Sequence, residues 1–231
     1  MSVRTYMRLP LLSLIGAAAA FAQPVTFGVR AGMPLTDFIS TVQNQGILGQ
    51  LGGFYSNTRP YILGPTVELR LPAGLGIELD ALYRRTNYSG TGVATNALNA
   101  ITTTISSTSA NAWEFPLLLK YRFKVPVVNP YVDAGFAWDT LSGLKQSVRQ
   151  TIVSASNLIN GTSLGSSIPA ALHKTGPSGF VMGAGLDIHA VLIHLSPEVR
   201  YTHWGSPHFQ DPAGLVKSNQ SQAEFLLGIT F

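Results

Sequence analysis

WEFPLLLKYRF, residues 113–123, carries an apolar row on one side of a predicted strand and charges of both signs on the other. The two rows separate because successive side chains of a β-strand point to opposite faces. The apolar row is Trp113, Phe115, Leu117, Leu119, Tyr121 and Phe123, and the other row is Glu114, Pro116, Leu118, Lys120 and Arg122. An apolar face with aromatic ends, backed by a charged face, is typical of a strand between lipid and a polar interior.

The same alternation of apolar and polar side chains recurs along the chain. The other alternating segments are 25–32, 62–71, 75–83, 130–139, 179–188, 193–201 and 223–231. Between them, long polar segments predicted as loops alternate with short connections; the long ones are 33–60, 87–111, 140–177 and 205–220. If both ends of the domain lie on one side, every long loop lies on the other. We therefore predict an all-β fold, an eight-stranded antiparallel transmembrane up-and-down β-barrel with short periplasmic turns.

The composition and the first residues agree with a single exported barrel domain. Charged residues make up 11 % of the 231 residues, about half the usual share, and cysteine is absent. Arg4 and Arg8 precede an apolar run that ends at Ala20-Phe21-Ala22, which predicts a cleaved signal peptide over residues 1–22 and export through the Sec pathway. An uncleaved membrane anchor is the alternative. The barrel domain is then residues 23–231.

The charge balance gives no support for nucleic-acid binding. Of the 15 lysines and arginines, Arg4 and Arg8 belong to the predicted leader, and the other 13 nearly balance 11 acidic residues. The chain also has no basic cluster of the kind that contacts phosphates. We therefore expect no nucleic-acid partner.

The aromatic residues test the predicted topology independently. One group falls at the external rim of the barrel: Tyr61, Tyr83, Tyr88, Trp113, Trp138, Tyr201 and Trp204. Tyr121, Phe123 and Phe231 fall at the periplasmic rim, and Tyr131 lies at the same level but faces inward. Two aromatic girdles are a property of outer-membrane barrels.

Most charged residues outside the leader fall on the inward faces of the predicted strands. They are Arg30, Glu68, Arg70, Glu78, Asp80, Arg84, Glu114, Lys120, Arg122, Asp133, Asp139, Asp187, Glu198, Arg200 and Glu224. Buried charges need partners, and an eight-stranded barrel is just wide enough for side chains to fill it. We predict a packed lumen of ion pairs rather than an open pore. Gly183 and Gly185 make room in this lumen.

Three prolines fit the barrel poorly. Pro65, Pro116 and Pro197 each lie inside a predicted strand, where proline removes one ladder hydrogen bond. We expect a bulge or a strand end at each of them.

These segments resemble a known family, the small outer-membrane β-barrel proteins of Gram-negative bacteria, of the outer membrane protein beta-barrel domain or PorT-like kind. The resemblance rests on 114–123, 130–135, 183–185, 197–201 and 228–231. It implies an outer-membrane location, contact with outer-membrane lipid, and assembly by the barrel-assembly machinery. By the same resemblance, the terminal Phe231 with Ile229 and Leu227 is the signal that this machinery recognises.

Four alternatives compete with a structural or surface-interaction role. A lipid A-modifying enzyme is one, because His203 and Ser206 loosely resemble a His–Ser pair of membrane-boundary deacylases, although we find no third group to orient the base. Glu78 and Asp80 lie on one strand face at a spacing that also suits acid–base catalysis. A narrow solute channel is another alternative. A soluble lipocalin-like barrel is the last, but it would need an apolar lumen.

The last predicted loop also offers a candidate metal site. His203, His208 and Asp211 lie close in sequence and offer zinc ligands. Short polar loops collect such residues by chance. For Glu78 and Asp80, ion pairing with inward arginines is a better explanation than catalysis. We therefore expect no catalytic residue, no metal and no cofactor. The surface partner stays unknown, and the long loops are the expected interaction surface.

Overall fold

The structure is a computed structural model, and strands dominate it. It describes residues 25–39, 42–45, 51–56, 61–95, 101–126, 128–154, 157–159, 163–166, 172–190, 193–210 and 217–231. The predicted leader, residues 1–22, lies outside these ranges. Over the described residues, no helix is long and apolar enough to cross a membrane.

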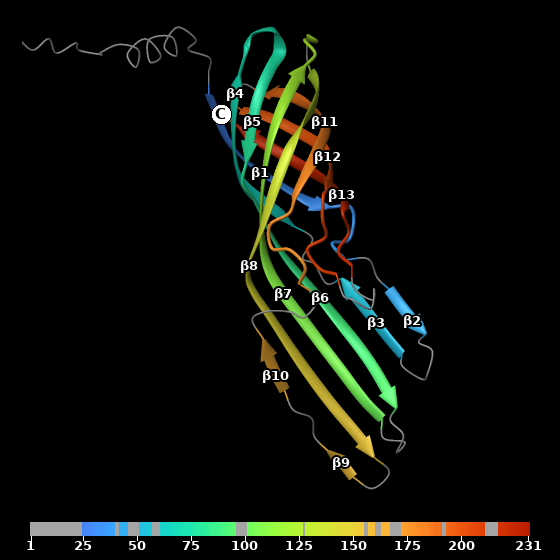
Figure 1. The fold of residues 1–231 in the computed structure, drawn as a ribbon. Coiled ribbons are helices and arrows are strands. Elements are labelled where there is room, and N and C mark those ends of the chain that lie inside the picture. The colour runs from blue at the N-terminus through green and yellow to red at the C-terminus, as the bar shows by residue number, and fades with distance from the viewer. Residues whose placement is uncertain are drawn as a thin grey trace, which may run out of the picture.

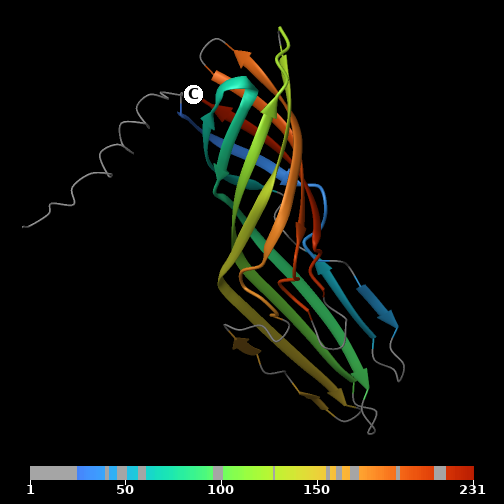
Figure 2. The same cartoon turned by 45° about the horizontal axis from the view of Figure 1, so that its top comes forward.

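Eight hydrogen-bonded strand positions close into a ring (Figures 1 and 2). In ring order they are β1 (Val25–Pro34), β4 (Ile62–Arg70), β5 (Leu75–Asp80) continued by β6 (Leu82–Thr95), β7 (Ile101–Arg122), β8 (Val128–Ser154), β11 (Ser178–Ala190), β12 (Ile193–Trp204) and β13 (Ser221–Thr230). All pairs are antiparallel, and β13 pairs with β1, as in Gly28 opposite Thr230. The predicted eight-stranded antiparallel barrel is confirmed.

Both described ends of the chain lie at one end of the barrel, which we call the turn end (Figure 1). The short connections that follow β4 and β7 lie there too, as do the adjoining ends of β11 and β12 (Figure 1). The first of them is a single 3-10 turn, Pro72–Gly74, with Ala73 and Gly74 at positive φ. We call the opposite end, where the longer connections lie, the loop end.

Three ring strands continue beyond the loop end as a sheet, which we call the extension. β6, β7 and β8 have 14, 22 and 27 residues, and they run together past the ends of the other ring strands (Figure 1). On one side, β3 (Leu51–Ser56) pairs with β6, and β2 (Val42–Gln45) pairs with β3. On the other side, β9 (Asn157–Ile159) and β10 (Ser163–Ser166) pair with β8.

Three of the segments predicted as loops are instead partly strand, and this part of the prediction is wrong. Segment 87–111 is mostly strand in β6 and β7, segment 140–177 contains the outer half of β8 with β9 and β10, and segment 33–60 contains β2 and β3. Alternation of apolar and polar residues could not reveal these strands, because neither face of the extension is uniformly apolar. The fourth predicted loop, 205–220, has only isolated bridges in its described part.

A bulge marks the point where β7 and β8 leave the barrel. Ser109 pairs with Lys145, but Asn111 pairs with Ser142, so β8 has one extra residue here. Gly143 lies in this stretch with a φ of 60°, a conformation that glycine adopts without steric cost.

The prolines interrupt the ladder without shifting its register, so the expected bulges and strand ends are wrong. The Pro65 carbonyl on β4 accepts a hydrogen bond from Ala81 N at 3.0 Å, but Pro65 has no N–H to donate in return. The neighbouring strand is interrupted at Ala81, between β5 and β6, whereas β4 itself continues. Pro116 pairs in register with Ala137. The β11–β12 pairing is interrupted beside Pro197. It continues in the same register from the pair Ile188 and Leu195.

The outward face of the ring is apolar and exposed. Phe27, Leu119 and Phe136 have 61 %, 58 % and 68 % of their surface accessible. A soluble lipocalin-like barrel would bury such residues, so that alternative is wrong. Among the predicted girdle residues, Trp113, Trp138 and Tyr201 are exposed, whereas Tyr88 and Trp204 are buried inside the molecule and correct the prediction.

Candidate functional site

The lumen is the candidate site, and the structure places the predicted inward charges inside it in three tiers. The lower tier, at the turn end, is Glu68, Arg70, Arg122, Asp187 and His194. The middle tier is Arg30, Glu78, Asp80, Lys120, Tyr131, Asp133, Glu198 and Arg200. The upper tier is Arg84, Glu114, Asp139, His208, Gln222 and Glu224. Except for Arg70, Arg122 and His194, all of these are buried.

Arg30 and Arg200 hold the middle tier together. Arg30 on β1 contacts Glu198 at 2.5 Å and Glu78 at 2.6 Å. Arg200 on β12 contacts Glu198 at 2.7 Å and Asp80 on β5 at 2.8 Å. β5 and β12 are four positions apart in the ring of eight, so the Arg200–Asp80 pair crosses the full width of the lumen.

Lys120 and Tyr131 fill the remaining width of the middle tier. Lys120 Nζ lies 2.5 Å from Glu78 and 4.2 Å from the centre of the Tyr131 ring. The Tyr131 hydroxyl donates a hydrogen bond of 2.8 Å to Glu198. A side chain in place of Gly185 would collide with this ring, at 2.5 Å from Tyr131 Cζ. The glycine therefore makes room for an aromatic side chain on the neighbouring strand.

The lower and upper tiers repeat this bridging between strands. In the lower tier, Arg122 contacts Glu68 at 2.5 Å and Asp187 at 2.9 Å. In the upper tier, Arg84 contacts Glu224 at 3.1 Å and Asp139 at 3.5 Å. Each arginine thus joins carboxylates from two other strands. A charge buried in this way is tolerated because opposite charges lie beside it.

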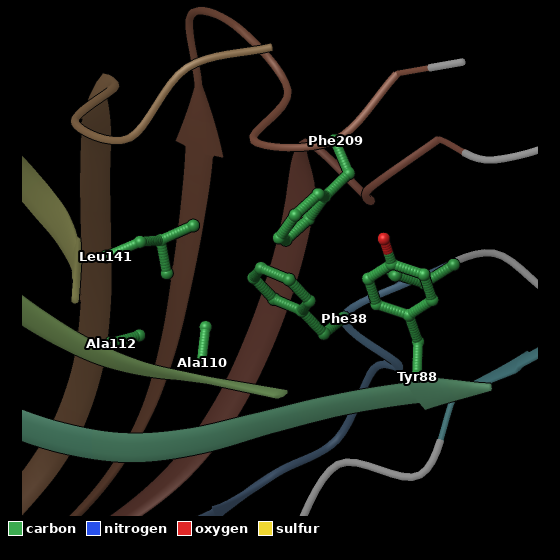
Figure 3. Packing of buried hydrophobic residues seen from close by; sticks show 7 residues of the cluster. Phe38, Tyr88, Ala110, Ala112, Leu141 and Phe209 are labelled. Carbon is green, nitrogen blue, oxygen red and sulfur yellow. The ribbon is translucent and has the colours of Figure 1, made fainter. Parts of the chain in front are cut away.

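An apolar cluster, which we call the plug, packs next to the upper tier at the loop end (Figure 3). Its members are Phe38, Ile39, Tyr88, Ala110, Ala112, Leu141 and Phe209. The rings of Phe38 and Phe209 meet edge to face at 6.2 Å. The Arg84 guanidinium carbon lies 5.3 Å from the centre of the Phe38 ring, so the plug rests directly on the charged lumen. The plug could not be predicted from alternation, because Phe38 and Phe209 lie in segments without periodicity.

The other predicted site residues are not brought together as the sequence suggested. His203 Nδ1 lies 3.1 Å from the hydroxyl oxygen of Ser221 on the exposed outward face, so its partner is Ser221 rather than Ser206. His208 is buried and its Nε2 lies 3.0 Å from Asp139, whereas His203 is exposed. Asp211 lies outside the described residues. Leu227 and Ile229 on β13, and Phe231 just after it, are all exposed.

The family is decided by sequence comparison. The family model described as outer membrane protein beta-barrel domain matches residues 9–225. The chain belongs to this family. It is therefore an outer-membrane β-barrel, with an apolar, exposed outward face and a charged face that lines the lumen. No curated protein shows a significant match.

Solved barrels of this kind share little sequence with the chain. OprG from Pseudomonas aeruginosa is 14 % identical, with 89 % of this chain and 92 % of that chain covered and a TM-score of 0.47. The N-terminal β-barrel domain of Pseudomonas aeruginosa OprF is 13 % identical, with coverages of 90 % and 98 % and a TM-score of 0.35. Neisserial surface protein A is 11 % identical, with coverages of 89 % and 94 % and a TM-score of 0.35.

Proposed function

We propose that this outer-membrane barrel is a closed, non-enzymatic scaffold that presents the extension for interaction at the cell surface. One observation carries the proposal. A tilted transmembrane strand needs about 9–11 residues, yet β7 and β8 have 22 and 27. Their outer halves therefore stand clear of the bilayer, braced by β6 and the short flanking strands. A rigid sheet is a better platform for a binding surface than a free loop.

The lumen supports a scaffold better than a channel. Arg200 and Asp80 join opposite walls at 2.8 Å, and the plug covers the loop end. The family's barrels meet lipid on the outward face, and here an apolar groove of about 510 Å³ lies on that face beside Tyr83 and Trp113. Lipid and the barrel-assembly machinery, through Phe231, are the partners that we infer for the barrel itself.

The chemistry of the extension favours an anionic surface partner. The charged side chains that β6, β7 and β8 carry beyond the upper tier are all basic: Arg85, Lys145 and Arg149. These three are exposed, and they lie among serine and threonine residues that add hydrogen-bonding capacity. Exposed cations attract polyanions over a Debye length of about 8 Å at physiological salt.

Cells that display the full chain should adhere to a sulfated-polysaccharide surface more strongly than to an uncharged dextran surface. The test variant replaces residues 90–106 and 147–165 by Asn-Gly turns, which removes the outer part of the extension together with Arg149 and keeps the barrel strands. We expect it to lose the difference. The double variant Lys145→Gln/Arg149→Gln should lower the difference in adhesion between the two surfaces at least several-fold. The effect of the substitutions should be smaller at high salt, where wild-type binding is already screened.

Heat-modifiable gel mobility serves as the control that each variant still forms a barrel. Adhesion that survives removal of the extension would contradict the proposed role. Mass spectrometry of lipid A from the same cells tests the non-enzymatic part. We expect the same acylation pattern with the chain, without it, and with His203→Ala. An acylation change that disappears in His203→Ala would contradict the non-enzymatic role and show that the chain is an enzyme.

A further inference from the structure

A histidine pair and a carboxylate meet at the turn end of the β11–β12 hairpin. Asp187 and His189 are two residues apart on β11, so their side chains lie on the same face. His194 on β12 is directly opposite His189 in the register of the hairpin. The hairpin thus gathers Asp187, His189 and His194 on its inward face, at the rim of the lumen.

The three side chains are close enough to share one ion. One ligand atom from each of the three lies within 4.8 Å of the other two. His194 Nδ1 and Asp187 Oδ1 are 3.3 Å apart, and the two imidazole rings lie at 4.2 Å between centres. Ligands at about 2.0–2.1 Å from a tetrahedral zinc ion lie about 3.3–3.4 Å from one another. The Asp187–His194 edge already has this length.

We propose that Asp187, His189 and His194 form a binding site for a divalent transition-metal ion of the zinc type. Two imidazoles and one carboxylate, with a further position open to water, are a common ligand set for such ions. The site also has an entry path, because His189 is exposed and His194 is partly exposed while Asp187 is buried. A metal here would clamp the ends of β11 and β12.

Arg122 orients the carboxylate, and Arg70 lies near it. Asp187 Oδ2 accepts a hydrogen bond of 2.9 Å from Arg122 Nε and lies 3.6 Å from Arg70 Nη2. Oδ1 is thereby turned toward His194, in the way that outer partners fix metal-binding carboxylates. The same arginines place positive charge beside the site. Because the three residues offer one carboxylate and two imidazoles, the site disfavours Ca²⁺ and Mg²⁺, which need several oxygen ligands, and favours ions that bind imidazole well.

Arg70 gives the proposal a second, opposite signal. Its Nη1 lies 3.5 Å from His194 Nε2 and competes with a cation for that ring. Removing the ligands should weaken metal binding, whereas Arg70→Gln should strengthen it, because a nearby positive charge is lost. A merely sticky histidine pair on the surface would not respond to Arg70 in this way.

The experiment uses the full chain without a histidine tag, folded in detergent, and titrates Zn²⁺ against a chromophoric chelator. We expect one Zn²⁺ per chain, at least about 10-fold weaker binding for His189→Ala and His194→Ala, and tighter binding for Arg70→Gln. His203→Ala and His173→Ala, which change histidines elsewhere, are matched controls and should bind as the wild type does. Co²⁺ absorption in the visible range reports tetrahedral coordination.

Three results would overturn the site. They are the absence of stoichiometric Zn²⁺ binding, equal binding by the His189→Ala variant, and loss of binding in His203→Ala. Heat-modifiable mobility in each sample separates lost ligands from a lost fold. The outcome is independent of adhesion, because the extension lies at the opposite end of the barrel (Figure 1).

Discussion

At the scale of single residues, the lumen depends on a few arginines that each serve several carboxylates. Arg200 alone contacts Glu198, Asp80 and Glu78, at 2.7, 2.8 and 3.3 Å. Its side chain is fully buried. Removing one such cation leaves three buried carboxylates without its positive charge, in a place that water reaches poorly. This destabilises the fold more than replacing the whole set of charges by apolar residues would.

Arg200→Met should therefore lower the free energy of unfolding by about 3–5 kcal/mol. Urea titration of the detergent-folded chain, followed by tryptophan fluorescence, measures the change. Arg85→Met is the matched control, because Arg85 is exposed on β6, and it should change stability by less than about 0.5 kcal/mol. Equal effects of the two substitutions would show that the middle tier does not stabilise the barrel.

Residue-level prediction succeeded where period-two alternation was enough. The inward placement of Arg30, Glu78 and Arg200 needed only the alternation of each strand. The meeting of His189 and His194 also needed the register of the hairpin, which the sequence between the two strands does not specify. The contact of His203 with Ser221 rather than Ser206 was missed for the same reason, because Ser221 is on the neighbouring strand.

At the scale of elements, the passage of β7 and β8 from barrel to extension depends on the bulge at Gly143. Tyr83 donates a hydrogen bond of 2.9 Å to the Asn111 side chain beside this bulge. A side chain at position 143 would meet Asn111 Nδ2 at 3.0 Å and would have to adopt a positive φ. The bulge therefore has one residue type that fits it well.

Gly143→Val should loosen the extension and leave the barrel intact. The left-handed conformation costs a non-glycine residue about 1–2 kcal/mol, and asparagine tolerates it better, so Gly143→Asn is the matched control. Hydrogen exchange followed by mass spectrometry should show faster exchange in peptides from 101–109 and 144–153 of the valine variant only. Faster exchange throughout the ring would contradict a local role for the bulge.

The strands of the extension show where reading elements from sequence stops. Within the membrane, one face of each strand must be apolar, and this made segments such as 113–123 conspicuous. Beyond the membrane that requirement ends, and 101–109 is a run of Thr, Ser and Ile without a consistent period. Threonine favours strands, but only pairing with β6 and β8 decides that this segment is one.

At the scale of the whole molecule, the three tiers and the plug act in series along the lumen. The tiers bridge the walls by ion pairs, and the plug covers the loop end with apolar side chains (Figure 3). Alternation predicted the charged interior. It could not predict the plug, because Phe38 and Phe209 come from two connections that meet only when the ring has closed.

Planar bilayers containing the folded chain should show no steady conductance. Phe38→Ala/Phe209→Ala should not open the barrel either, because the contacts of Arg30 and Arg200 across the middle tier remain. A general porin recorded in the same bilayers is the control. Stable, regular current steps from the unmodified chain would mean that the ion-pair tiers leave a continuous aqueous path.

The pairing of β1 with β13 also determines when the barrel can close during folding. Gly28 pairs with Thr66 on one side, but its partner on the other side is Thr230, so one edge of β1 stays open until β13 has been delivered. An open edge invites pairing with any other extended chain. The polypeptide must therefore be kept from premature contacts over nearly its whole length, and its maturation is a single late event rather than a stepwise growth.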